Sequence, residues 1–229
     1  MVEPPRNDST SEQAAERTQF QLERMILFSD AVFAIAITLL IIEIKVPEPK
    51  PPFTEASLLQ SMVTLIPKVI GFLLSFFLIG LYWTVHHRMF GYLTNYTRKL
   101  IWMNLVFLLA IVMMPFSTAF FSEYSTPETI HLLTPLISYV ANIWFIGLMN
   151  FKLWGYIGKP ASKISEGIPG GHFLALARTR SLVVPIIFSC MIPVALFAPS
   201  QARYIPMAIP FVMKVVNGLF EINTNRLKT

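Results

Sequence analysis

Long apolar stretches alternating with polar or basic segments dominate this chain of 229 residues. A helix needs about 20 apolar residues to cross a hydrocarbon core of roughly 30 Å, and six stretches come close to that length. The pattern therefore predicts six membrane-spanning helices, at 22–46, 62–85, 100–121, 130–153, 180–198 and 203–220. They make an all-α, polytopic transmembrane domain over 21–221, between a polar N-terminal segment at 1–20 and a C-terminal tail at 222–229.

Composition supports a membrane protein and excludes an ordinary soluble domain. Hydrophobic residues make up 54% of the chain and charged residues only 14%, far from the usual balance of a soluble domain. The polar N-terminal segment has too little apolar surface to fold alone, so a disordered tail or a short helical lead-in is expected. The first apolar run is too long for a secretory signal and should stay in the mature protein.

The net charge of +5 is spread unevenly over the connecting segments. Lys and Arg gather before the first span, between the second and third, and between the fourth and fifth. Because basic residues stay preferentially in the cytoplasm, both termini are expected there, with short loops on the outer side. The connector 154–179, broken by glycine and proline, is expected to be a cytoplasmic loop. The positive charge therefore indicates topology, and no nucleic-acid partner is expected.

The entrance of the first span carries charges that a membrane does not accept alone. Arg24 and Asp30 lie about 240° apart around a helix, so each needs a partner from another helix. Ionisable groups within spans usually face the protein interior. The same membrane level offers polar groups from the second and third spans. The sequence predicts a hydrogen-bonded network of Ser29, Asp30, Trp83, Asn104 and one histidine of the pair His86 and His87, with Phe28 at the entrance.

The sequence gives little support for an enzyme or a metal site. It contains no phosphate-binding glycine loop, no His-Glu-x-x-His and no Gly-x-Ser-x-Gly. His86 and His87 are adjacent and do not share a helical face, and the single Cys190 cannot form an intrachain disulfide. No Thr-Val-Gly-Tyr-Gly carbonyl filter is present either. No cofactor is expected.

The first span has a regular stripe along one side. Its residues are spaced by four, three and four, with Leu39 beside the third: Ala31, Ile35, Thr38 and Ile42. The other side, with Phe33, Ile37, Leu40 and Ile41, is equally apolar, so periodicity does not decide which side packs. Glu43 follows at the outer end, either as a solvated helix-end charge or as a charge that concentrates cations at an outer mouth.

These residues match a known pattern. Arg24-x-x-x-Phe28-Ser29-Asp30, running into Ala31 through Ile44, resembles the first span of the prokaryotic transmembrane protein 175 family of potassium channels. The Tyr-Trp-x-x-His-His segment ending at His87 and the third-span segment from Asn104 to Thr118 are similar to that family too. The resemblance implies a homotetramer of six-span subunits in a bacterial cell (inner) membrane. In it the first helices line a pore for potassium ions and the outer helices face lipid.

The resemblance also implies residue roles. The pore constriction corresponds to Ile35, Thr38, Leu39 and Ile42, and whether Thr38 or Leu39 faces the pore stays open. The arginine and the Phe-Ser-Asp motif would tie the first helix to the second and third. An apolar ring strips water from a passing cation, which is harder for sodium because it holds its hydration shell more tightly; dewetting of the ring would also provide a gate.

The leading hypothesis is thus a potassium-selective, leak-type channel. The alternative is a proton-coupled secondary transporter, suggested by the proline-interrupted last two spans and by Asp30 beside the histidine pair. The lack of an internal repeat weighs against it. A third possibility is a membrane scaffold in which the network between Arg24 and Asp30 serves packing only.

Overall fold

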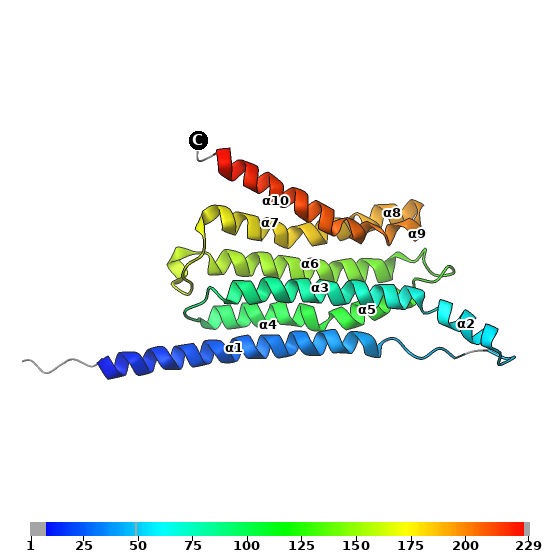
Figure 1. Cartoon of the computed structure of the whole chain (residues 1–229), viewed down its shortest axis with the longest axis horizontal. Coiled ribbons are helices and arrows are strands. Elements are labelled where there is room, and N and C mark those ends of the chain that lie inside the picture. Colours follow the sequence, from blue (N-terminus) through cyan, green and yellow to red (C-terminus); the bar gives the residue numbers. More distant parts are fainter. Residues whose placement is uncertain (1–7, 49, 227–229) are drawn as a thin grey trace, which may run out of the picture.

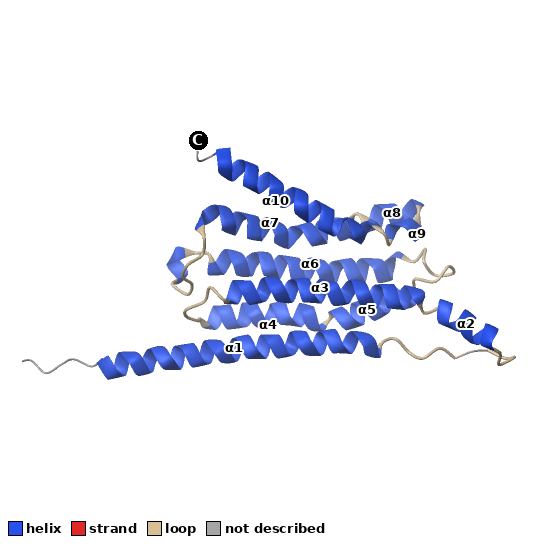
Figure 2. Ribbon diagram, viewed as in Figure 1, coloured by secondary structure: helices blue, strands red, loops and turns tan. Residues whose placement is uncertain are grey.

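A computed structural model describes residues 8–48 and 50–226, with side chains described for 12–48 and 50–220. Over these residues the chain is helical and contains no strand beyond one isolated bridge between Leu93 and Ser165 (Figure 2). The predicted all-α class is confirmed.

Five helical segments have the length and composition to cross a membrane, as a multi-pass membrane protein requires. The helices are α1 (Asp8–Ile42), α2 (Glu55–Val63), α3 (Ile66–Phe90), α4 (Arg98–Val112), α5 (Met114–Glu123), α6 (Leu133–Ile157), α7 (Gly170–Ser189), α8 (Met191–Phe197), α9 (Pro199–Ala202) and α10 (Ile209–Arg226), with short 3-10 turns η1 (Pro160–Ser162) and η2 (Ile205–Ala208). The five candidate spans are Glu12–Ile42, Ile66–Phe90, Arg98–Glu123, Leu133–Ile157 and Gly170–Phe197.

The sixth predicted span, 203–220, corresponds to η2 and most of α10. Prolines at 206 and 210 delay the start of a regular α-helix until Ile209. The resulting helix has 18 residues and is not among the five candidate spans in the described part of the chain. A sixth span stays a prediction.

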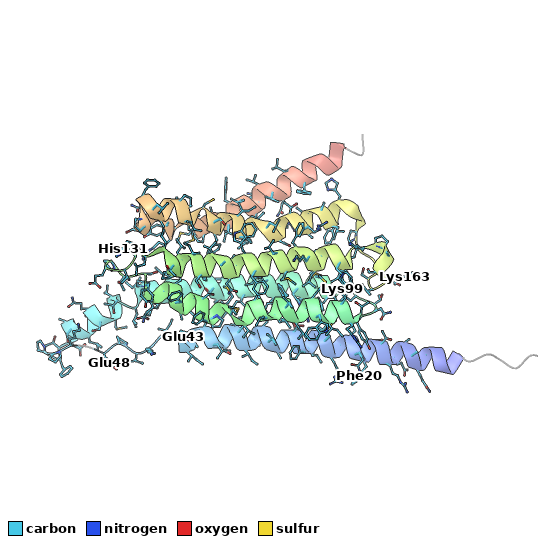
Figure 3. All side chains as sticks on the ribbon, turned by 180° about the vertical axis from the view of Figure 1, so that it is seen from behind. Phe20, Glu43, Glu48, Lys99, His131 and Lys163 are labelled. Carbon is cyan, nitrogen blue, oxygen red and sulfur yellow. The ribbon has the colours of Figure 1, made fainter. Side chains whose placement is uncertain are left out.

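The long helices lie side by side as a bundle, with α1 at one edge and α10 at the other (Figure 1). α1 packs against α3, α4 and α5; α6 packs against α4, α5 and α7; and α10 packs mainly against α7. α3 and α6 finish, and α4 and α7 begin, at the same end. We call it the basic end, because it holds Lys99 and Lys163, whereas Glu43, Glu48 and His131 lie at the opposite end (Figure 3).

Two spans are interrupted near a proline. Pro115 is the second residue of α5, and the helix axis breaks just before it at Met113. The backbone nevertheless continues, because the Met113 N–H donates to the Leu109 carbonyl at 3.1 Å and the Ser117 N–H donates to Met113 at 3.0 Å. A second break separates α7 from α8 at Cys190, after Pro185. Each pair of helices therefore forms one kinked span.

A close approach between neighbouring helices joins α6 and α7 at Gly147. A Cβ atom added there would lie 2.4 Å from the Cγ atom of Pro185 and 2.7 Å from the Ser181 carbonyl oxygen. Only glycine fits such a contact without moving one of the helices. Small residues permit this kind of packing between membrane helices, where dispersion and hydrogen bonding drive association.

The expected loop at 154–179 is wrong in its extent. α6 continues to Ile157 and α7 already begins at Gly170, so the connector covers only 158–169. Of the basic residues in 154–179, Lys159 and Lys163 stay in the connector, whereas Arg178 belongs to α7, because a long cationic side chain can pack its stem on apolar neighbours. Arg178 illustrates this, with its guanidinium carbon 4.2 Å from the centroid of the Phe151 ring.

The terminal and outer segments also differ from expectation. Residues 8–20 form the first part of α1, as a helical lead-in, and 222–226 continue α10; residues 1–7 and 227–229 lie outside the described residues. The connector between α1 and α3, expected to be a short outer loop, is longer because it contains α2. Thr54 caps that helix: its Oγ1 atom accepts from the Ser57 N–H at 3.2 Å.

Candidate functional site

The structure decides which side of α1 packs on the bundle. Phe33, Ala36 and Leu40 are at most 2% exposed, whereas Ile35 is 58% and Ile42 is 66% exposed. Ala31, Thr38 and Leu39 are exposed as well. The side of α1 that carries the predicted stripe is thus left open along the edge of the chain.

Arg24 and Phe28 extend this exposed stripe toward the basic end. Positions 24, 28, 31, 35, 38 and 42 follow the spacing of one helical face. The Phe28 side chain is 53% exposed, and the Arg24 guanidinium carbon lies 5.8 Å from the centroid of the Phe20 ring on the same helix. The expectation that these two residues tie α1 to the next two spans is therefore not met within one chain. We call positions 24, 28, 31, 35, 38, 39 and 42 the α1 stripe.

Ser29 begins a buried chain of hydrogen bonds across three helices. Its hydroxyl donates to the Met25 carbonyl at 2.9 Å and accepts from the Asn104 Nδ2 atom at 2.8 Å. The Asn104 Oδ1 atom pairs with the His86 Nε2 atom at 2.9 Å, which assigns the proton to that nitrogen. All three side chains are at most 1% exposed. The chain connects α1 to α4 and α4 to α3.

Aromatic rings hold the His86 imidazole in place. The ring stacks on Phe90 with centroids 3.9 Å apart and lies parallel to Phe107 at 5.5 Å, with Phe33 also at 5.5 Å. His87 instead is exposed and lies beside Trp83, with ring centroids 5.6 Å apart. The histidine of the predicted network is thus His86. Among the described residues, no group of three or more His, Cys, Asp or Glu side chains is arranged for a metal ion.

Asp30 makes a second, separate link. Its Oδ1 atom accepts a hydrogen bond from the Trp83 Nε1 atom at 2.9 Å, joining α1 directly to α3. The two links start from adjacent residues, which point about 100° apart on a helix. Together they fix the rotation of α1 about its axis. The α1 stripe consequently faces away from the rest of the chain.

Thr38 and Glu43 lie on the part of α1 that is far from this network. The Thr38 hydroxyl donates to the Ile35 carbonyl at 2.9 Å, so its oxygen lone pairs stay available on the exposed side. Glu43 comes directly after the last residue of α1, is exposed, and lies at the end opposite Lys99 (Figure 3). It borders a hollow of about 200 Å³ that Lys45, Lys68 and Glu123 also line.

Sequence reasoning missed a second buried polar cluster. The Ser75 Oγ and Tyr139 hydroxyl oxygens are 2.7 Å apart, and the Thr118 hydroxyl donates to Ser75 at 2.7 Å, joining α3, α5 and α6. The signal was present, because polar side chains within apolar spans usually face partners inside the bundle. Tyr139, Asn142 and Asn150 are three such residues of α6.

Comparison with known proteins identifies the segment that contains α1, α3 and α4. Residues 24–115 match the family model described as endosomal/lysosomal potassium channel TMEM175. Over this segment the chain is similar to the TMEM175 family. The match covers the α1 stripe and the hydrogen-bonded groups of both links.

Relatives of the TMEM175 segment come from bacteria and vertebrates. A protein of Streptomyces collinus named as a potassium channel is 40% identical over 101 residues, 44% of this chain and 48% of that protein. One from Chamaesiphon minutus, also named as a potassium channel, is 41% identical over 106 residues, 46% and 52% of the two chains. A chicken protein named endosomal/lysosomal proton channel TMEM175 is 33% identical over 58% of this chain and 27% of its own length. The chain spans about half the length of its bacterial relatives, and all three are channels by name.

The fold similarity extends beyond the TMEM175 segment. A crystal structure of a lysosomal potassium-selective channel TMEM175 homolog from Chamaesiphon minutus superposes with a TM-score of 0.68 at 24% identity, covering 85% of this chain and 97% of that one. A variant of the potassium channel MtTMEM175, solved with a nanobody fusion protein, gives 0.52 at 18% identity, covering 89% and 93%. The shared fold therefore includes much of the second half of the chain as well.

Proposed function

We propose that this chain is a subunit of a potassium-selective, leak-type channel in which several copies of α1 surround a central pore. The observation that carries the proposal is the α1 stripe, an exposed row in which Arg24 and Phe28 are followed by aliphatic side chains and one threonine. Two buried or half-buried links hold this row away from the subunit's own core. Two relatives named as potassium channels are 40% and 41% identical to this chain over 101 and 106 residues.

One chain alone does not enclose a pore, since α1 lies at the edge of the bundle (Figure 1). A homotetramer with α1 innermost would turn four α1 stripes toward one axis and leave the outer helices against lipid. Arg24 and Phe28 would then contact neighbouring copies or line the entrance. The basic end would face the cytoplasm of a bacterial cell with both termini, in keeping with the distribution of Lys and Arg.

Selectivity in this proposal arises from dehydration. Ile35 and Ile42 would form two apolar rings that a hydrated cation crosses only by losing water, and sodium loses water at the greater cost. Thr38 oxygens between the rings would replace part of the hydration shell. Leu39 would lie beside Thr38 and narrow the same level, while Glu43 would raise the cation concentration at the outer mouth.

The proposal is tested by potassium flux from liposomes that contain the purified protein. A polar amide in an apolar ring should lower the barrier for all cations, so Ile35→Asn and Ile42→Asn should increase flux and reduce the preference for potassium over sodium. Ile41→Asn is the matched control: Ile41 is also exposed, at 52%, but points about 100° from Ile42. No potassium flux from the wild type, or equal effects of all three substitutions, would refute the proposal.

A proton measurement separates the channel from the alternative transporter. Vertebrate relatives are named proton channels, so a pH-sensitive dye belongs in the same liposomes. A pore conducts potassium in proportion to the gradient, with or without a protonophore. Flux that saturates with potassium and stops when the proton gradient collapses would instead establish proton-coupled transport.

A further inference from the structure

A partly open cavity lies between α3, α6, α7 and α10, on the side of the bundle away from α1. Its volume is about 220 Å³, several times the space of one water molecule (about 30 Å³ in the liquid). On α3 and α6 the lining residues belong to the half of the helix nearest the basic end, from Leu81 to Arg88 and from Asn150 to Trp154. It is therefore distinct from the α1 stripe and from the links that orient α1.

Three side chains that line this cavity carry polar atoms that are buried and have no hydrogen-bond partner in the described part of the chain. They are the Tyr82 hydroxyl, the Asn150 Oδ1 atom and the Trp154 Nε1 atom. Their side chains are only 3%, 2% and 2% exposed. Buried polar groups are rarely left unpaired, because losing water without gaining a partner costs free energy. Two hydrogen-bond donors and one acceptor thus lie on side chains that surround one cavity, which indicates that a polar ligand occupies it.

The positive charge of the cavity wall favours an anion as the ligand. Arg88 and Arg180 line the cavity, and the lining residues that the structure describes include no Asp or Glu. The Arg180 Nε atom donates to Asn217 of α10 at 2.7 Å, which places this guanidinium beside the space. The rest of the wall is mostly apolar, with Leu81, Val85, Leu176, Val184 and Met213. An anionic head attached to an apolar body matches this combination.

We infer that the cavity binds the head group of an anionic phospholipid that also carries hydroxyl groups. Phosphate oxygens would accept from Trp154 and Tyr82 and lie near the two arginines, and a head-group hydroxyl would donate to Asn150. Basic pockets between membrane helices on the cytoplasmic side are suited to anionic lipids. α10, which packs mainly against α7, would cover the bound lipid from outside.

The test measures the melting temperature of the detergent-solubilised protein and needs no ion flux, so it is independent of the proposed function. Phosphatidylglycerol should raise the melting temperature, and phosphatidylcholine with the same acyl chains should not. Tyr82→Phe removes only an unpartnered hydroxyl, so the lipid-free protein should stay as stable as the wild type, whereas Trp154→Phe also leaves a void in the core and should lower the melting temperature of the lipid-free protein. The lipid concentration for half the effect should nevertheless rise about fivefold to tenfold, the loss of roughly one hydrogen bond.

Two substitutions outside the cavity serve as controls. Trp102→Phe, the control for Trp154→Phe, alters an exposed tryptophan of α4, and Arg98→Gln, the control for Arg88→Gln, removes an exposed charge at the basic end. Both variants should respond to lipid as the wild type does. Arg88→Gln should weaken the response. Equal responses to both lipids, or unchanged responses in the cavity variants, would overturn the inference. Inorganic phosphate that reproduces the whole shift would replace the lipid with a free anion.

Discussion

At the scale of single residues, Asn104 has the greatest effect on the orientation of α1, because one amide serves two helices. It donates to Ser29 and pairs with His86, and both partners are buried. In an apolar interior neither partner has water as a substitute. Asn104 thus couples the position of α1 to that of α3 without contacting the α1 stripe.

Replacing Asn104 should therefore destabilise the protein. Asn104→Leu would leave the Ser29 and His86 polar groups buried with one partner fewer, at a cost of about 2 to 4 kcal/mol in the free energy of unfolding. Denaturant titration in detergent measures this difference. Thr84→Val is the control, since the exposed Thr84 hydroxyl bonds only its own helix, to the Gly80 carbonyl. Equal losses in the two variants would contradict the role of Asn104.

Thr38 permits a second prediction at this scale, which rests on the proposed pore. Thr38→Val keeps the shape of the side chain and removes the oxygen, so the potassium-to-sodium permeability ratio should fall about twofold to tenfold, the equivalent of one hydrogen bond. Thr38→Ser should restore it. Bi-ionic recordings give the ratio. If Thr38→Val instead kept the wild-type permeability ratio and Thr38→Ser changed it, the ratio would depend on side-chain volume, and selectivity would come from the apolar rings alone.

At the scale of helices, the tight crossing of α6 and α7 holds the second half of the chain together. Gly147→Ala would place a methyl group against Pro185 and a backbone carbonyl, forcing the helices apart. We expect a loss of about 1 to 3 kcal/mol in unfolding free energy. In contrast, Gly80→Ala on α3 meets no atom within 4 Å and should be neutral or slightly stabilising, because alanine favours a helix. Denaturant titration of the two variants should therefore give changes in unfolding free energy that differ in sign or by at least about 1 kcal/mol.

The helices also show which features the sequence could predict and which it could not. Apolar length and composition were enough for the bundle, and polar residues at one membrane level were enough to place Ser29, Trp83 and Asn104 near one another. Periodicity alone did not separate the two sides of α1, because Phe33 and Ile35 are equally apolar and only packing distinguishes them. Arg24 and Phe28 were grouped with Ser29 through their motif, although their helical phase puts them on the α1 stripe. The extent of α7 was missed because Arg178 packs on an aromatic ring.

At the scale of the whole molecule, the exposed α1 stripe requires an explanation that one chain does not supply. Four chains are proposed, so native mass spectrometry should find a complex of four times the 26.0 kDa of one chain. Phe28→Glu would add like charges to the shared face and should shift the population to smaller species. A monomer in mild detergent, or a mass unchanged by this substitution, would remove the basis for a pore made of α1 copies.

The central claim is that the α1 stripe faces the ion path, and cysteine accessibility tests it most directly. Cys190 is the only cysteine and is exposed, so Cys190→Ser provides the background. A thiol-reactive cation should block potassium flux through liposome-reconstituted Ile35→Cys and Thr38→Cys, and leave Ile41→Cys conducting. Block at Ile41→Cys with none at the other two positions would place the stripe against lipid and contradict the account.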